Sequence, residues 1–548
     1  MDQDSASHPI DRLAGRYWSY VERHFPERAV ANRTQRTVTT WPDLAPEARF
    51  ARRTELVGLR AELAGIDVGT TPADVALTGA ALGWELHNGI EQTHHPTERF
   101  GINPIYGPHH TLVQGALDTL VETRDEAQAY LERLIAFGAH VDGAIASADQ
   151  GLAEDGSVAP RVCLERIPRQ IRGLLDTADG LQALTRPLAG SPPEWGWPER
   201  LGRIVDGEVR PALARLGAWV EANLGRAPVT SPLAGDDAGQ EWYAACVRDQ
   251  TSLDVAVDDL ESIGTAGLDR LLETARDIAR TAGDIGSLLA QVERPGPGDF
   301  VSPQELFAAH AATCGRVDAG LDRIVSERPT MAYQVEEMPE VFADGGPIAY
   351  YVPSSVEAGR PGKFWVNLLG WETRRRWTTV PLCLHESVPG HHLQIALADD
   401  RHDLPAFRRH GVWNGYAEGW AVYSERLADL LDLDLSTGDR LGLLAHQSWR
   451  AARLVVDSGI HRRGWTVEQA AAFLTRSAGL PAAEALSESI RYACWPGQST
   501  GYWLGAEAIG TAVGRAVAAG SDLRAVHGRL LGAGPLPLAV LSRLWPVA

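Results

Sequence analysis

The chain has 548 residues, of which 44% are apolar and 22% charged, the balance of a globular protein with a substantial core. Its 71 acidic and 51 basic side chains give a net charge of -20, which disfavours nucleic acid and anionic membranes as partners. Five cysteines without a C-x-x-C pair argue against a disulfide framework or a thiolate zinc site. Without a signal-peptide core or a run of ~20 apolar residues, the chain is predicted to be cytoplasmic and not inserted in a membrane.

Most of the chain has a helical pattern. Apolar residues recur at helical spacing in four long segments, 112–148, 201–225, 240–292 and 303–328. Ser302 with Glu305 three residues later predicts a capped helix start. Proline and glycine clusters at 192–198 and 294–298 predict loops, which are possible borders between subdomains.

The pattern changes after about residue 330. Alternation through Ile348, Tyr350 and Val352 predicts a short strand, and a second follows at 364–366. Helical texture then returns and continues to the C-terminus. We therefore predict a mainly α fold with one small β-sheet. Residues 1–330 are expected to form one side of a cleft and 331–548 the catalytic part, unless both belong to one integrated domain.

The segment LHESVPGHHLQ, residues 384–394, carries the strongest chemical signal. In the H-E-x-x-H pattern two histidines one helical turn apart bind zinc, and the glutamate between them activates a water molecule. His385 and Glu386 match its first half. The second histidine would fall on Pro389, so the ligand must come from elsewhere.

Two histidines can replace it. His392 returns to the face of His385 on an ideal helix but lies ~10.5 Å along the axis, far for sharing one ion. His391 is on the wrong face of an ideal helix, but Pro389 and Gly390 can bulge or widen the helix there. We favour His391 as the ligand and assign His392 to the layer of residues around the ligands.

A third ligand is expected in NGYAEGWAVYSERL, residues 414–427. Glu418 lies far enough from His391 for a helix, a loop and a return. Gly415 and Gly419 on either side of it allow close approach of backbones. Glu425, two turns later on the same face, is expected to support a ligand from outside the metal's coordination sphere.

A polar stripe is predicted on the helix spanning residues 444–465. His446, Arg450, Arg453, Asp457 and His461 share one face, while much of the rest is apolar. Such a stripe must be paired internally or line a cavity. One interpretation is an Arg453–Asp457 ion pair. The other is a cleft wall, in which Arg453 and His461 contact substrate, an arginine is available to a substrate carboxylate, and Asp457 supports them.

The two motifs together resemble a bacterial family of unknown function marked by His-Glu-x-x-Pro-Gly-His-His and then Tyr-x-Glu-Gly-Trp-Ala. That family is similar to the gluzincin metallopeptidases, and the resemblance covers roughly residues 345–510. It implies a large helical gluzincin-like fold around a substrate cleft. Many gluzincins have glycine directly before the second histidine, which matches Gly390-His391.

The same resemblance extends to RYACWPGQSTGYWLG, residues 491–505. Tyr502 follows a glycine, as does the gluzincin tyrosine that donates a hydrogen bond to the developing oxyanion, a role that suits a neutral phenol. An aromatic core position is the alternative for Tyr502. Arg491 and Gln498 are expected to contact substrate.

The combined prediction is a zinc-dependent hydrolase with one Zn²⁺ per chain, held by His385, His391 and Glu418. Glu386 is the expected general base, and Tyr502 is expected to stabilise the oxyanion. The strand at 363–367 is expected at the cleft edge, where an extended peptide can add, which favours a metallopeptidase acting on short peptides. The alternatives are hydrolysis of a non-peptide amide or ester in a small molecule, and a non-catalytic binding protein that retains the fold.

Overall fold

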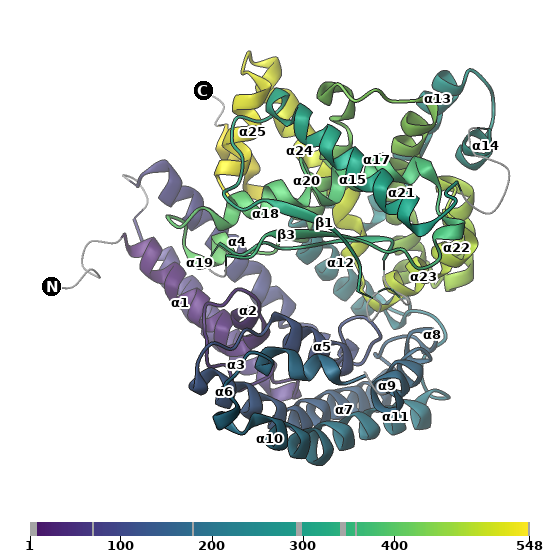
Figure 1. The fold of residues 1–548 in the computed structure, drawn as a ribbon. Coiled ribbons are helices and arrows are strands. Elements are labelled where there is room, and N and C mark those ends of the chain that lie inside the picture. Colours follow the sequence, from purple (N-terminus) through teal and green to yellow (C-terminus); the bar gives the residue numbers. More distant parts are fainter. Residues whose placement is uncertain are drawn as a thin grey trace.

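The computed structural model describes residues 8–67, 71–177, 180–291, 299–339, 343, 347–356 and 359–545. It confirms a mainly α fold with one small sheet. The helices form two lobes, with the sheet on the side of the upper lobe that faces the lower one (Figure 1). None of the described helices is both long enough and apolar enough to cross a membrane.

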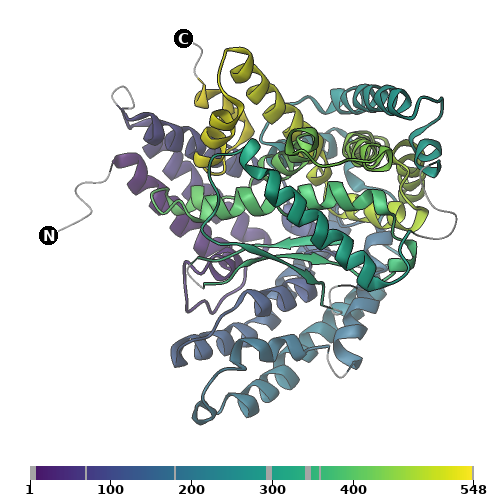
Figure 2. The ribbon, with the colours of Figure 1, turned by 45° about the horizontal axis from the view of Figure 1, so that its top comes forward.

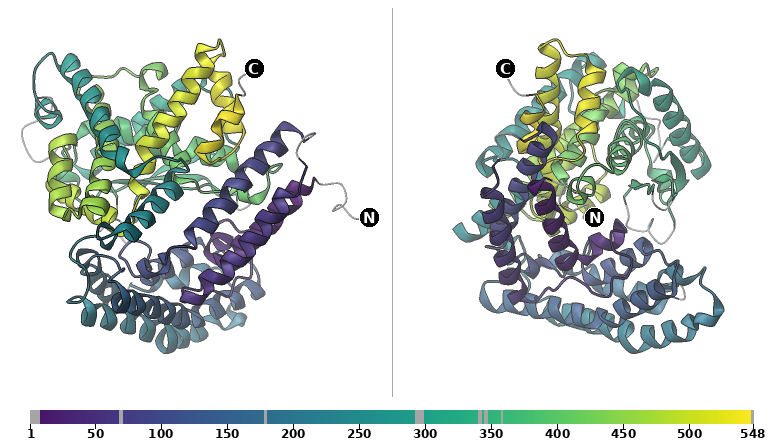
Figure 3. Two further views of the ribbon diagram at one scale, coloured as in Figure 1. Left: turned by 180° about the vertical axis from the view of Figure 1, so that it is seen from behind. Right: turned by 90° about the vertical axis from the view of Figure 1, so that its left-hand side faces the viewer.

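The lower lobe is built from the N-terminal part of the chain. It contains α2 (Pro26–Ala31), α5 (Pro108–Asp118), α6 (Arg124–Ile135), α7 (Phe137–Glu154), α8 (Arg161–Leu164), α9 (Ile167–Asp176), α10 (Trp197–Ile204) and α11 (Arg210–Asn223). Along one flank of the molecule, three helices pack on one another (Figure 3): α1 (Pro9–His24), α3 (Pro46–Ala64) and α4 (Ala73–Gln92). Helix α4 also contacts α12 of the upper lobe, so it links the two lobes.

The upper lobe contains the remaining helices. These are α12 (Asp237–Thr251), α13 (Leu260–Ala279), α14 (Ile285–Ala290), α15 (Pro303–Gly320), α17 (Thr379–Glu386), α18 (His391–Asp399), α19 (Ala406–Arg409), α20 (Asn414–Glu425), α21 (Thr437–Arg463), α22 (Val467–Ala478), α23 (Ala482–Cys494), α24 (Gly501–Ala518) and α25 (Leu523–Gly532). Helix α15 begins where predicted, because the Ser302 hydroxyl accepts the Glu305 backbone N–H at 3.1 Å. Helices α12, α13 and α15 come from the first 330 residues, yet they lie in this lobe (Figure 1).

The sheet has three strands in the order β1-β3-β2: β1 (Tyr333–Glu337), β2 (Ala349–Val352) and β3 (Gly362–Val366). Strand β3 runs parallel to β1 and antiparallel to β2. Helices α15 and α17 pack on the sheet, and α18 runs across the same side (Figure 2). The two strands expected at 348–352 and 364–366 are present. The prediction that residues 363–367 lie at an edge is wrong, because β3 is hydrogen-bonded on both sides and β2 is an edge strand.

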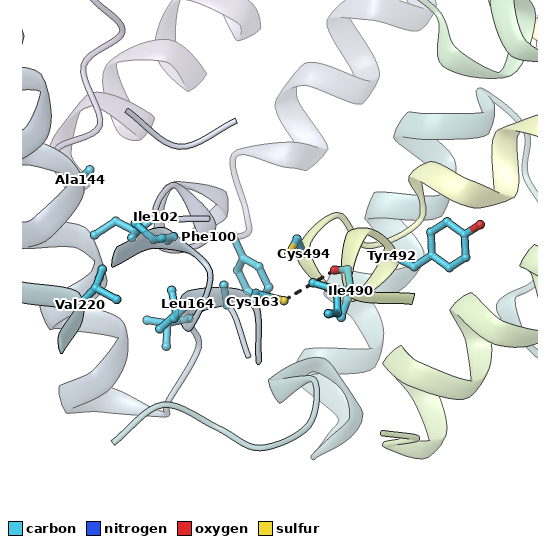
Figure 4. Close-up of a cluster of buried hydrophobic side chains, with 14 of the residues drawn as sticks. Phe100, Ile102, Ala144, Cys163, Leu164, Val220, Ile490, Tyr492 and Cys494 are labelled. Carbon is cyan, nitrogen blue, oxygen red and sulfur yellow. Dashed lines mark hydrogen bonds between the residues drawn. The ribbon is translucent and has the colours of Figure 1, made fainter. Parts of the chain in front are cut away.

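One apolar cluster joins the two lobes. Phe100, Ile102 and Val220 from the lower part pack in the same cluster as Ile490 and Cys494 at the end of α23 (Figure 4). All five side chains are buried. Because apolar burial contributes roughly 25 cal/mol per Å², this shared core opposes independent movement of α23 and the lower lobe. That constraint matters because α23 carries Arg491.

Candidate metal centre

The centre is built first by the chain reversal between α17 and α18. The helix that carries His385 ends at Glu386, and a new helix begins at His391, so the expected bulge is a complete break. Only glycine fits at position 390, where a Cβ atom would lie 2.0 Å from the carbonyl oxygen of His385. The Trp420 indole N–H donates to the Pro389 carbonyl oxygen at 2.7 Å and ties this turn to α20.

The break places the two imidazoles next to each other. The ring centroids of His385 and His391 are 4.8 Å apart, with the rings nearly perpendicular. Oε2 of Glu418 lies 3.3 Å from Nε2 of His385 and 3.4 Å from Nε2 of His391. The three ligand atoms all lie within 4.8 Å of one another. The structure thus brings together the three residues that were predicted as ligands from the sequence.

The two distances from Glu418 Oε2 fit a tetrahedral metal ion. Two ligand atoms each ~2.0–2.1 Å from one tetrahedral zinc are ~3.4 Å apart, which matches the separation of Glu418 Oε2 from both nitrogens. Within the described part of the chain, this buried oxygen has no hydrogen-bond partner. A buried carboxylate oxygen without a donor is costly unless a cation neutralises it. Two imidazoles and one carboxylate are also a common donor set of catalytic zinc.

A further carboxylate orients His385 from behind. Nδ1 of His385 lies 2.9 Å from Oε1 of Glu425, whose side chain is fully buried. A carboxylate only accepts hydrogen bonds, so Nδ1 carries a proton, and Nε2 is the nitrogen that faces Glu418. Gln447 donates to the other Glu425 oxygen at 2.8 Å. This carboxylate–histidine arrangement is typical of the layer around metal ligands, as expected for Glu425.

The charges of the centre are strongly coupled. Burial lowers the pKa of His385, but its contacts with Glu418 and Glu425 outweigh burial and raise it to about 9. Burial raises the pKa of Glu418, but His391 and His385 hold it well below its ordinary value. Without a metal, His385 is therefore positively charged at neutral pH, with a proton on each ring nitrogen, and a cation bound at Nε2 would displace the proton there.

Tyr502 approaches Glu418 because two helices cross in close contact. A Cβ atom on Gly419 of α20 would lie 2.5 Å from Gly505 Cα of α24, so only glycine allows this crossing. The Tyr502 hydroxyl donates to Glu418 Oε1 at 2.9 Å. Its ring lies nearly parallel to that of His385, with centroids 6.3 Å apart. The phenol therefore sits at the centre itself, although it is largely buried.

Glu386 and Tyr350 complete this side of the centre. Glu386 follows His385 directly, is half-buried and has no hydrogen-bond partner in the described residues. Tyr350 on edge strand β2 is 51% exposed. Burial and the charges of Glu386 and Glu418 nevertheless raise the pKa of its phenol to about 12. The Glu418 side chain is itself 19% exposed, so this side of the centre is not sealed from solvent.

His392 points away from this centre. Its Nδ1 lies 2.9 Å from the Tyr351 hydroxyl oxygen, and its ring packs on Tyr333, with centroids 4.8 Å apart. The Ser354 backbone N–H donates to the same oxygen, which leaves the hydroxyl proton for His392. Burial lowers the pKa of His392 to about 4, so the ring is neutral at pH 7. His392 fixes α18 against the sheet.

Three of the predicted substrate-binding residues share one network next to Tyr502. Arg453 stacks on the Tyr502 ring, with its Cζ 3.9 Å from the centroid, and pairs with Glu488 at 3.2 Å. Arg491 pairs with Glu488 at 2.8 Å and donates to the Gln498 side-chain oxygen. The Arg453–Asp457 ion pair considered above is not formed. Glu488, three residues before Arg491 on α23, was missed, although this helical spacing is a signal for such a pair.

Asp457 and His461 lie deeper in the protein. Asp457 accepts hydrogen bonds from the Tyr243 hydroxyl, the Gly497 N–H and the Ser499 hydroxyl at 2.7–3.1 Å. It shapes the loop that leads into α24 and so positions Tyr502. His461 is fully buried between the Ser231 hydroxyl and the Tyr492 carbonyl, and it is not brought to the centre with the other predicted residues.

Proteins with a similar fold are known. The chain is similar over 98% of its length to a crystal structure from Colwellia psychrerythraea, provisionally described as a lipoprotein, with a TM-score of 0.88, 24% identity and 97% of that chain covered. A second structure, from Shewanella oneidensis, has the same provisional description with unknown function, a TM-score of 0.73 and 15% identity, and 98% and 100% of the two chains are covered. These identities show the shared fold alone. Functionally curated proteins give no match. Residues 26–544 match the family described as bacterial protein of unknown function (DUF885), and the chain therefore belongs to that family.

Proposed function

We propose that this protein is a zinc-dependent hydrolase, and that its substrates are short peptides. The observation that carries the proposal is the convergence of His385 Nε2, His391 Nε2 and the unpaired, buried Oε2 of Glu418. Glu425 behind His385 adds the support that metal-ligating histidines usually have. The resemblance of both motifs to gluzincin peptidases points to the same chemistry.

The chemistry follows from the groups around the three ligands. Zinc bound there would polarise a carbonyl and lower the pKa of water. Glu386, with a carboxylate that no donor occupies, would accept the proton of the attacking water and pass it to the leaving amine. The Tyr502 hydroxyl would turn from Glu418 to the developing oxyanion and donate its hydrogen bond there. Glu425 keeps His385 in the tautomer that leaves Nε2 free.

The sheet favours an extended substrate. Strand β2, not β3, presents an unpaired edge in the described structure, and Tyr350 on it interacts electrostatically with Glu386, Glu418 and Tyr502. A peptide can add to such an edge through backbone hydrogen bonds. This arrangement supports peptide hydrolysis over hydrolysis of a non-peptide amide or ester.

The test begins with the metal. The purified protein should bind about one zinc per chain, and Glu418→Ala should abolish this, because a three-ligand site cannot spare one ligand. Glu468→Ala, a change at an exposed position of α22, is the matched control and should keep the zinc. Elemental analysis that finds no zinc after reconstitution would refute the metal centre.

Activity is tested separately. The zinc-loaded protein should cleave members of a mixed library of short peptides, detected by mass spectrometry. Glu386→Gln should keep the zinc and lose most turnover, because the amide has nearly the same shape but cannot take up a proton. Cleavage of esters and non-peptide amides alone would support the alternative hydrolase. Zinc binding without turnover of either class would support a binding protein.

We place this activity in the cytoplasm. All five cysteines are free, as expected in a reducing compartment. The two similar structures are provisionally described as lipoproteins. Lipid-anchored proteins fractionate with membranes, whereas unanchored cytoplasmic proteins do not. Fractionation of the native host separates the two cases: we expect the protein in the soluble fraction, and recovery with membranes would overturn this location.

A further inference from the structure

Three arginines gather beside the Tyr502 ring. Arg450 and Arg453 come from α21, one turn apart, and their Cζ atoms lie 5.5 and 3.9 Å from the ring centroid. Arg491 comes from α23 and shares Glu488 with Arg453. Arg450 and Arg453 are 4% and 3% exposed, whereas the Arg491 side chain is 20% exposed. The cluster therefore lies largely inside the protein, and Arg491 is its most exposed member.

The neighbouring carboxylates satisfy this cluster only in part, although Glu484 on α23 also interacts electrostatically with Arg450 and Arg453. Glu488 already accepts from Arg453, Arg491 and the Tyr492 hydroxyl. Glu425 lies 3.8 Å from Arg450 but is bonded to His385 and Gln447, as described above. As a result, Nε and Nη1 of Arg450 and Nη1 of Arg453 are buried without a hydrogen-bond partner among the described residues.

Buried guanidinium N–H groups without an acceptor are costly, since each loses its hydrogen bond to water and gains none from the protein. A bound anion would supply the missing acceptors and remove this cost. The planar fork of arginine binds a carboxylate through two parallel hydrogen bonds, which gives both strength and orientation. Two arginines one helical turn apart present several such donors to one anion.

We propose that Arg450, Arg453 and Arg491 bind the free C-terminal carboxylate of a peptide, so that the enzyme removes residues from the C-terminal end. This inference rests on the proposed peptidase function and names its substrate class. Arg450 and Arg453 supply the donors that have no acceptor, and Arg491 is the most exposed of the three.

The position of Tyr502 sets the distance between the two sites. Its hydroxyl touches Glu418 while its ring stacks on Arg453, so a single side chain separates the metal ligands from the arginine cluster. One residue of extended chain spans ~3.3–3.6 Å. A carboxylate at the cluster is therefore only one or two residues from a carbonyl beside Glu418. Every peptide carries one such anion, its terminal carboxylate, one or two residues after a carbonyl group.

The decisive experiment compares peptides that differ only at their C-terminus. Zinc-loaded protein is assayed on three forms of one cleavable peptide. These are the free acid, the C-terminal amide, and the C-terminal amide of the peptide extended by one aspartate, whose side chain supplies a carboxylate. We expect kcat/KM for the free acid to exceed that for the amide by roughly 10–100-fold, the value of a lost charge-assisted hydrogen bond pair. Rescue by the aspartate side chain would assign the cluster to acidic side chains and overturn terminal recognition, and so would equal rates on acid and amide.

Arginine variants test the assignment. Arg450→Gln and Arg453→Lys should lower kcat/KM for the free acid more than kcat/KM for the amide, so the acid-to-amide ratio should fall toward one. Arg440→Gln is the matched control, since Arg440 lies on the same helix but pairs with Asp429 at the surface and should keep the full preference. If a thermal melt shows that the Arg453→Lys protein is not folded at the assay temperature, the Arg450→Gln variant alone tests the role of the cluster. An unchanged preference in a folded Arg450→Gln protein would refute the role of the cluster.

A binding measurement without turnover tests the carboxylate site independently of the proposed peptidase activity. Calorimetry with the Glu386→Gln protein measures affinity for a dipeptide as the free acid and as its amide, without any turnover. Tighter binding of the acid, lost in Arg450→Gln, would support the carboxylate site even if no hydrolysis is found. Cleavage of peptides with no preference for the acid would leave the peptidase proposal intact and overturn this one.

Discussion

Nδ1 of His385 donates to a carboxylate oxygen of Glu425 at 2.9 Å, and both side chains are buried. This contact fixes the imidazole tautomer and turns Nε2 toward His391 and Glu418. It also contributes to the raised pKa of His385. A residue that binds no metal itself thus sets both the orientation and the basicity of a proposed ligand.

The first prediction follows from this contact. Glu425→Gln should lower zinc affinity by roughly 10–100-fold without abolishing binding, as expected when a partner of a ligating histidine is lost. Competition with a chromogenic chelator measures the change. Glu425→Gln should still fold, because Gln447 can bond to an amide. An unchanged zinc affinity would show that the Glu425 contact has no part in metal binding.

The second prediction ranks the neighbouring histidines. His391→Ala should reduce zinc affinity by several orders of magnitude, because it removes one of three ligands. His392→Ala should have a much smaller effect, since that ring bonds to Tyr351 and packs on Tyr333. Titration of zinc into both chelator-stripped variants decides. Weaker binding in His392→Ala than in His391→Ala would refute the assignment.

Local sequence features predicted much of this arrangement. Helices followed from apolar spacing, and a distortion of the helix between the two histidines followed from Pro389-Gly390, whose missing N–H and missing Cβ disrupt a regular helix. The close approach of α20 followed from Gly415 and Gly419. The direction of the His391 side chain depends on whether the helix is distorted or interrupted. Here α17 ends at Glu386 and a separate helix begins at His391.

Other features depend on contacts between distant parts of the chain. Strand β1 was missed because Tyr333–Glu337 lacks a buried alternation, and it pairs with residues almost 30 positions later. An ion pair of Arg453 with Asp457 on its own helix was one interpretation of the sequence. In the structure Arg453 pairs with Glu488, 35 positions away. Asp457 instead holds the loop at Gly497 and Ser499. Such choices depend on tertiary packing, which periodicity does not describe.

The third prediction concerns pH. The metal-free protein holds a proton on His385, with a pKa of about 9, that zinc must displace. Below that pKa, apparent zinc affinity should rise by up to ~10-fold per pH unit, and it should level off above it. Calorimetry at pH 7 in buffers of different ionisation enthalpy should detect about one released proton per zinc. No proton release at pH 7 would contradict the raised pKa.

A matched variant sharpens this test. In Glu425→Gln the hydrogen bond to a charged carboxylate is lost, so the pKa of His385 should fall. The affinity should then level off at a lower pH than in the wild type, and proton release at pH 7 should decrease. An identical pH profile in both proteins would assign the proton to another group.

The fourth prediction concerns Tyr502, whose hydroxyl donates to Glu418 at 2.9 Å. If it moves to the oxyanion during the reaction, Tyr502→Phe should reduce kcat by roughly 10²–10³-fold, as for loss of one oxyanion donor, with little change in KM or zinc affinity. If instead it only orients Glu418, the same variant should weaken zinc binding by roughly 10–100-fold and leave kcat of the zinc-saturated enzyme nearly intact. Steady-state kinetics at saturating zinc, together with the chelator titration, separate these outcomes. We expect the loss in kcat, because Glu418 retains its two imidazole neighbours without the phenol, whereas the oxyanion would lose a donor.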